Sequence, residues 1–145
     1  MNTILFALDG NTSRTYAYPC TETSVGGKDY VDTLKKWGGV KYARVGGDKD
    51  DAIITDFTKL NPLLVPSYGL EGGNSGDELI DFVKNVEKSG GMGVFMFHGI
   101  GGDYITTPAA SHKALLEYLK KNKKDIWVAT FQQAMDYIAQ AKGKS

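Results

Sequence analysis

The residue of this chain best suited to chemistry is His98, one of 2 histidines among 145 residues. It ends an apolar run, Met92–His98, and is followed at once by Gly99-Ile100-Gly101-Gly102. An imidazole changes its charge near neutral pH, so it can move a proton or bind a metal. In parallel α/β folds, catalytic and binding residues lie at the carboxyl ends of strands, so the position of His98 predicts a functional site at the mouth of a strand. The alternative is a histidine that caps a loop carbonyl.

A second candidate is the segment Tyr18-Pro19-Cys20, which ends the first expected strand. Cys20 is the single cysteine of the chain, so it cannot form an internal disulfide. The redox state of the compartment in which the protein works therefore stays open. Two interpretations stay open for its thiol. It could form a thiolate–imidazole pair with His98, or it could be the commoner small, half-buried thiol.

Other polar features are expected to be structural. His112 falls in register with Leu115, so we expect it to pack on a helix face rather than bind a ligand. The run Lys120-Lys121-Asn122-Lys123-Lys124 is expected to end a helix, where cations complement the carbonyl dipole. Tyrosines in loops could stack on sugar rings, although packing is their commoner role. The loop tyrosines are Tyr16, Tyr18, Tyr68 and Tyr104.

Composition limits the class of protein. Lys and Arg together number 17, as do Asp and Glu, so the formal net charge is zero. This balance removes the electrostatic reason to expect a nucleic acid or an anionic membrane as partner. No membrane span or signal peptide is expected from the sequence, and the cellular location stays open. The length predicts a single α/β domain over residues 1–145 that needs no disulfide or structural metal.

Alternating strand and helix patterns, separated by glycine doublets, fill the first half of the chain. Expected there are strands at Thr15–Tyr18, Tyr42–Val45 and Leu63–Val65, a helix at Asp29–Trp37 and a weak helical pattern at Asp50–Leu60. The pair Asp9-Gly10 is expected to form a turn.

The second half carries clearer signals. Ser75–Glu78 fits a capping box that opens a helix, and Gly90 is its expected stop. Met92–His98 is typical of a strand covered on both faces. Thr107-Pro108 opens another helix, Ile126–Ala129 is expected to be a strand, and Thr130–Gln133 fits a second capping box. The expected inward-facing side chains are Leu79, Phe82, Val83, Val86, Leu115, Leu116, Leu119, Phe131, Ala134, Ile138 and Ala141. Repeated βα units predict an α/β fold with a parallel sheet.

Several segments follow one another in the order found in a known family. They are Tyr16–Cys20, Tyr42–Val45, Leu64–Tyr68, Gly91–Gly101 with His98 inside it, and Asp125–Phe131 followed by Tyr137-Ile138. Together they resemble the polysaccharide deacetylases, carbohydrate esterase family 4, and match the C-terminal half to two-thirds of that family's domain. The resemblance implies a partial or distorted (β/α) barrel. It also implies hydrolysis of N- or O-acetyl groups on chitin-like, peptidoglycan or xylan chains by a divalent metal, usually zinc.

The same resemblance assigns roles to individual positions. His98 stands where the family has the histidine that protonates the leaving group. Met96 stands where a leucine usually helps to form the acetyl pocket. Cys20 takes the place of the residue whose backbone N–H faces the oxyanion, Pro19 matches the family's proline, and Tyr18 lies beside them as a substrate-binding candidate.

The chain departs from the family at the metal site. Ala17 stands where many members have arginine, and Thr21 stands where they have glycine. The sequence has no Asp-Asp pair at a strand end and no His-x-x-x-His, so we predict no metal ligands and no cofactor for this chain. Two functions stay open. One is a metal-dependent carbohydrate deacetylase of which this is a portion, and the other is a non-catalytic deacetylase-like domain with a carbohydrate-binding or assembly role. Expected partners are an acetylated polysaccharide or oligosaccharide and further copies of the chain, which would cover an open strand edge.

Overall fold

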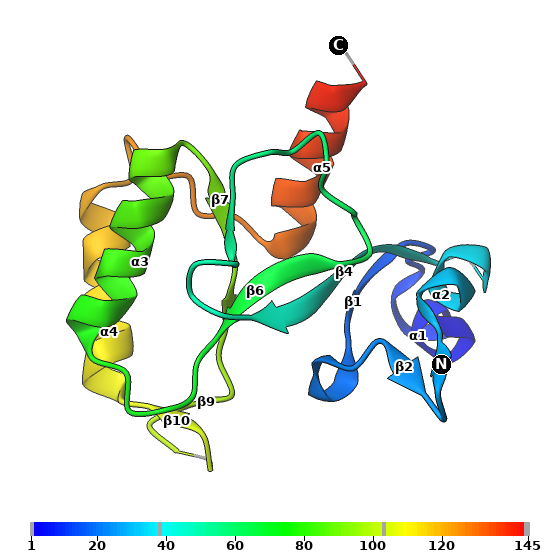
Figure 1. Cartoon of the computed structure of the whole chain (residues 1–145), viewed down its shortest axis with the longest axis horizontal. Coiled ribbons are helices and arrows are strands. Elements are labelled where there is room, and N and C mark those ends of the chain that lie inside the picture. The colour runs from blue at the N-terminus through cyan, green and yellow to red at the C-terminus, as the bar shows by residue number, and fades with distance from the viewer. Residues whose placement is uncertain (1, 38, 103, 144–145) are drawn as a thin grey trace. The chain divides into compact units, whose positions relative to one another are not determined.

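A computed structural model describes residues 2–37, 39–102 and 104–143 and shows a mixed α/β fold (Figure 1). The chain divides into two compact units. Unit 1 comprises Met1–Val45, Thr58–Val65 and Thr130–Ser145, and unit 2 comprises Gly46–Phe57 and Pro66–Ala129. Within the described residues, no helix is both long and apolar enough to cross a membrane.

Unit 1 is built around a parallel strand pair. Its elements are α1 (Asn2–Asp9), β1 (Arg14–Ala17), the 3-10 turn η1 (Pro19–Thr21), β2 (Ser24–Val25), β3 (Lys28–Asp29), α2 (Val31–Trp37), β4 (Val40–Gly47, which runs on into unit 2) and α5 (Phe131–Lys142). β1 pairs with β4 in parallel, with Tyr16 opposite Ala43 and Ala17 opposite Arg44. β2 and β3 form a small antiparallel hairpin. The expected strands at Thr15–Tyr18 and Tyr42–Val45 are confirmed in all but their end residues.

The core of unit 1 is aromatic. Tyr18, Ala43 and Leu63 are buried together, and Tyr16 and Tyr30 pack against them. The ring of Tyr18 lies 5.3 Å from that of Tyr16 and 5.5 Å from that of Tyr30, distances typical of favourable ring pairs.

Helix α5 is tied to β4 by polar contacts. The predicted capping box opens it, since the Thr130 hydroxyl accepts from Gln133 N–H and the Gln133 side chain accepts from Thr130 N–H. The Tyr42 hydroxyl donates to Asp136 over 2.8 Å, and Lys41 pairs with the same carboxylate.

Unit 2 combines short strands with a pair of helices. Its elements are β5 (Ile53–Ile54), β6 (Val65–Gly69, whose first residue is counted with unit 1), α3 (Gly76–Ser89), β7 (Met92–Gly93), β8 (Phe95–Met96), β9 (Gly99–Ile100), β10 (Thr106–Thr107) and α4 (Ala109–Lys121). β6 and β8 are parallel, as are β9 and β10, whereas β5 and β7 are antiparallel. Helices α3 and α4 lie side by side (Figure 1).

The core of unit 2 lies under α3 and α4. Leu70, Leu79, Val83 and Leu115 are buried together. The predicted caps of α3 are confirmed, because Ser75 and Glu78 form the reciprocal capping box and Gly90 ends the helix at a φ of 64°.

Two predictions in the middle of the chain are wrong, and a third is right only at its last residue. Asp50–Leu60 is not a helix, since Ile53 and Ile54 form β5 and pair with Gly93 and Met92. Met92–His98 is not one buried strand. It divides because β7 pairs antiparallel with β5 while β8 pairs parallel with β6, and its side chains are half-buried or, at His98, exposed. The strand expected at Leu63–Val65 begins only at Val65, because Leu63 and Leu64 lie in a turn.

The last expected strand, Ile126–Ala129, is also absent from the described structure. Ile126 packs against the core of unit 2, but Trp127 and Val128 are each 62% exposed and have no strand partner among the described residues. Strand-forming side chains need a neighbouring strand on a sheet, and no described strand pairs with this segment. The inward-facing list is likewise wrong at Leu116, which is 51% exposed, and at Ala141, which is exposed.

Candidate functional site

The carboxyl ends of β6 and β8 form the strand mouth of unit 2. The two strands run in parallel with Tyr68 opposite Phe95 and Gly69 opposite Met96, so both end at the same edge. His98 follows this edge and is exposed to solvent. The structure therefore places the predicted histidine at a strand mouth, on the surface of unit 2.

A small strand pair holds an aromatic ring beside His98. β9 and β10 pair in parallel, with Gly99 opposite Thr106, and this pairing fixes the two ends of the segment that carries Tyr104. The Tyr104 side chain is 86% exposed, and its ring centroid lies 6.3 Å from that of His98 in an edge-on arrangement. An imidazole and a phenol ring thus share one exposed surface.

Two buried polar atoms lie close behind this mouth. Gly73 N–H donates to the carbonyl of Thr106 over 2.9 Å, which joins the loop before α3 to β10. Next to this bond, Asn74 Oδ1 and Thr106 Oγ1 are buried and have no hydrogen-bond partner among the described residues. Buried polar atoms of this kind are normally satisfied by hydrogen bonds.

Met96 lies against Gly69 at the same edge. A Cβ atom added to Gly69 would lie only 2.9 Å from the Met96 terminal methyl group. The Met96 side chain can pack here because Gly69 has no side chain. Met96 is half-buried. Its role in an acetyl pocket stays a prediction.

The second histidine packs as predicted. The ring of His112 on α4 lies 5.2 Å from that of Phe97 at an interplanar angle of 88°. His112 is half-buried, and Phe97 packs against the core of unit 2. Of the two histidines, only His98 is exposed.

The Tyr18-Pro19-Cys20 segment lies in unit 1 and follows β1. Tyr18 is 4% exposed, and its hydroxyl donates to the Leu63 carbonyl over 3.0 Å. Cys20 is exposed, and both it and Thr21 have positive φ, at 50° and 61°. Left-handed backbone is strained for residues with a side chain, at a cost of about 1–3 kcal/mol each. The roles predicted for Tyr18 and Cys20 stay predictions.

Burial shifts the pKa of several groups in unit 1, among them Tyr30 and Arg44. Burial and the neighbouring Tyr16 raise the pKa of Tyr30 to about 12. Burial lowers the pKa of Arg44, which is half-buried, and no carboxylate among the described residues pairs with it. Arg14, by contrast, forms two hydrogen bonds to Asp9, of 2.9 and 2.7 Å.

The described residues do not offer a metal site. No three side chains of His, Cys, Asp or Glu in this part of the chain are grouped so that they could hold an ion. The zinc that the family resemblance implies therefore finds no fitting ligand set among these residues.

No family model, curated protein or solved structure matches this chain. The assignment of function therefore depends on the residues themselves and their geometry.

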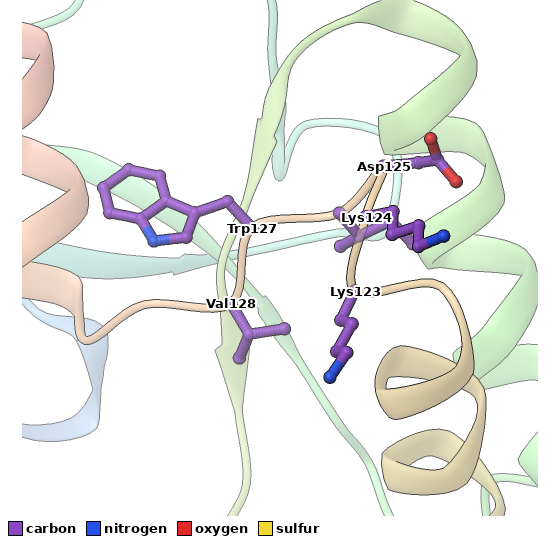
Figure 2. A pocket seen from close by; sticks show the side chains of 6 residues that line it. Lys123, Lys124, Asp125, Trp127 and Val128 are labelled. Atoms are coloured by element: carbon purple, nitrogen blue, oxygen red, sulfur yellow. The ribbon is translucent and has the colours of Figure 1, made fainter.

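One surface was not foreseen as a site. Ile126, Trp127 and Val128 line a shallow cavity of about 350 Å³ together with Lys123, Lys124 and Asp125. Figure 2 shows the Trp127 indole on one side of this loop and the Lys124 side chain on the other. Sequence reasoning missed this surface because it predicted a strand at Ile126–Ala129, and a sheet would have covered the Trp127 indole. The four lysines just before Trp127 were the signal that could have revealed it.

Proposed function

We propose that this chain is a deacetylase-like α/β domain, a partial (β/α) barrel, that binds acetylated carbohydrate at the His98 strand mouth without hydrolysing it. The observation that carries the proposal is the exposed pair of rings formed by His98 and Tyr104 at the carboxyl ends of parallel strands. Ligand sites of α/β folds gather at this edge. The order of the deacetylase-like segments supports the choice of carbohydrate as ligand.

The chemistry of the mouth suits a sugar. A tyrosine ring presents an apolar face to the C–H groups of a pyranose, and its hydroxyl and the imidazole nitrogens can exchange hydrogen bonds with sugar hydroxyls. Met96, close to the same edge, offers an apolar contact for an acetyl methyl group. No group in this set supplies the Lewis acid that metal-dependent deacetylation needs.

Binding is tested by titrating the whole chain with N-acetylchitooligosaccharides and acetylated xylo-oligosaccharides, followed by isothermal calorimetry and by the imidazole resonances in NMR. The proposal predicts saturable shifts of the His98 resonances and smaller or no shifts at His112. Tyr104→Ala should weaken binding about fivefold, the loss expected for one aromatic contact. The matched variant Tyr137→Ala, which removes another exposed tyrosine, should change affinity less than twofold.

Catalysis is tested separately. The alternative function, metal-dependent deacetylation, predicts acetate release that rises with added zinc or cobalt and is abolished by a chelator. We expect none. Metal-stimulated release would refute the non-catalytic proposal and would require ligands from a second chain or from a rearranged His98 region.

A further inference from the structure

The loop that follows α4 carries positive charge that pairs with no carboxylate in the described part of the chain. Residues 120–125 contain four lysines and one aspartate. None of the four lysines forms an ion pair with a carboxylate within the described residues, although Lys113 and Glu117 pair one turn earlier on the same helix. Lysines at a helix C-terminus complement its dipole, which accounts for Lys120 and Lys121. It does not account for Lys123 and Lys124, which lie beyond the helix.

The loop is held in place by its own backbone. The Asn122 carbonyl accepts hydrogen bonds from Asp125 N–H at 3.0 Å and Ile126 N–H at 2.9 Å, and the Asn122 side chain donates to the Tyr118 carbonyl at 2.8 Å. Ile126 packs against the core of unit 2. Because the turn is anchored at both points, Lys123, Lys124 and Trp127 are presented in a defined arrangement.

Beside these charges the loop exposes apolar surface. Trp127 and Val128 are each 62% exposed and line the cavity of about 350 Å³ with Lys123, Lys124 and Asp125. The exposed side chains of Trp127 and Val128 therefore place apolar surface beside charged groups, where an extended ligand can contact both kinds of group.

We infer that this surface binds an acidic oligosaccharide, one whose sugar rings carry carboxylate groups. The indole supplies an apolar face for a ring, the ammonium groups of Lys123 and Lys124 attract carboxylates, and Asp125 can accept hydrogen bonds from hydroxyls. Because the Trp127 and lysine side chains extend in different directions (Figure 2), one small ring cannot contact both. A ligand of several linked rings can.

A nucleic acid fits the same surface less well. Strands of nucleic acid are bound by a row of aromatic rings along a positive groove, and here Trp127 is the one aromatic side chain that lines the cavity.

The surface is separate from the His98 mouth. α4 begins just after β10 and extends alongside α3, so its C-terminal end lies away from β9 (Figure 1). The lysines belong to this end of α4 and the loop after it, whereas His98 directly precedes β9. The two proposals can therefore fail independently.

The test uses oligogalacturonate as the acidic probe, a neutral xylo-oligosaccharide of equal length, and a single-stranded oligonucleotide. We expect the chain to bind oligogalacturonate at least fivefold more tightly than the neutral probe at low salt, and the preference to shrink as salt screens the charges. Loss of the preference, or an affinity that salt does not change, would overturn the inference. So would tighter binding of the oligonucleotide.

Variants locate the effect. The double variant Lys123→Gln/Lys124→Gln should weaken oligogalacturonate binding about fivefold, as expected for two surface charge contacts. The control Lys35→Gln/Lys36→Gln removes an equal charge from an exposed lysine pair on α2 and should change affinity less than twofold. Trp127→Ala should weaken binding while Trp127→Phe retains most of it. Equal losses in both lysine variants would show that net charge alone, and not this surface, drives binding.

Discussion

Tyr18→Phe is the substitution that best separates a structural from a ligand-binding role in unit 1. Tyr18 is a predicted substrate-binding residue, yet it is 4% exposed and its hydroxyl donates to the Leu63 carbonyl at 3.0 Å. Phenylalanine keeps the ring and its contacts with Tyr16 and Tyr30, and it removes only the hydroxyl. The variant therefore isolates one buried hydrogen bond.

The expected loss follows from the burial of both partners. Leu63 is 7% exposed, so its carbonyl would lose its donor without gaining full access to water. An unsatisfied buried acceptor costs about 1–2 kcal/mol of unfolding free energy. For a chain of this size, that corresponds to a fall in the thermal midpoint of roughly 3–8 °C.

The assay is urea denaturation followed by circular dichroism, with the slope of the transition compared between variants. The midpoint should fall while the slope stays constant, and oligosaccharide binding should be unchanged. Tyr137→Phe, which removes an exposed hydroxyl in the same unit, should stay within about 0.5 kcal/mol of the parent chain. The reasoning would be refuted by a Tyr18→Phe protein with unchanged stability and weakened oligosaccharide binding, because its hydroxyl would then serve a ligand.

His98→Ala should keep unfolding free energy within about 1 kcal/mol of the parent, because an exposed side chain contributes little to the core; a larger loss in urea melts would make His98 structural. The contribution of Tyr30 to the unfolding free energy should be complete below pH 10, the usual tyrosine pKa, and should be lost as the pH rises toward about 12. The reason is that in this range Tyr30 stays protonated in the folded state and ionises in the unfolded state. Alkaline denaturation curves of Tyr30→Phe should be shallower in that window. Arg44→Met should leave the urea midpoint unchanged or raise it, because the variant removes a half-buried charge that no described carboxylate balances; a clearly lower midpoint would show that the guanidinium has a stabilising partner. The chain should be a dimer or larger by light scattering at micromolar concentration, and Ile4→Ser/Leu8→Ser, which removes two of the exposed apolar side chains of α1, should shift it toward the monomer; a parent chain that is already monomeric would contradict this.

The sequence by itself determined the elements whose signals are local. The capping boxes at Ser75 and Thr130 and the glycine stop at Gly90 were predicted and are confirmed, because a cap is formed by residues within one helical turn of each other. The prediction for His98 differs, since it was expected to be the last residue of a single strand, Met92–His98, and it lies instead in the bend between β8 and β9.

Tertiary structure decided what the apolar stretches became. Ile53 and Ile54 have helical spacing with their neighbours, yet they form a strand because Gly93 and Met92 offer a backbone to pair with. Trp127 and Val128 have strand-forming side chains, yet they lie exposed where no described strand pairs with them. Likewise, only folding brings Tyr104 beside His98, through the pairing of β9 with β10. A strand exists only through the partner it pairs with, and the choice of partner depends on residues far away in the sequence, which no local pattern can specify.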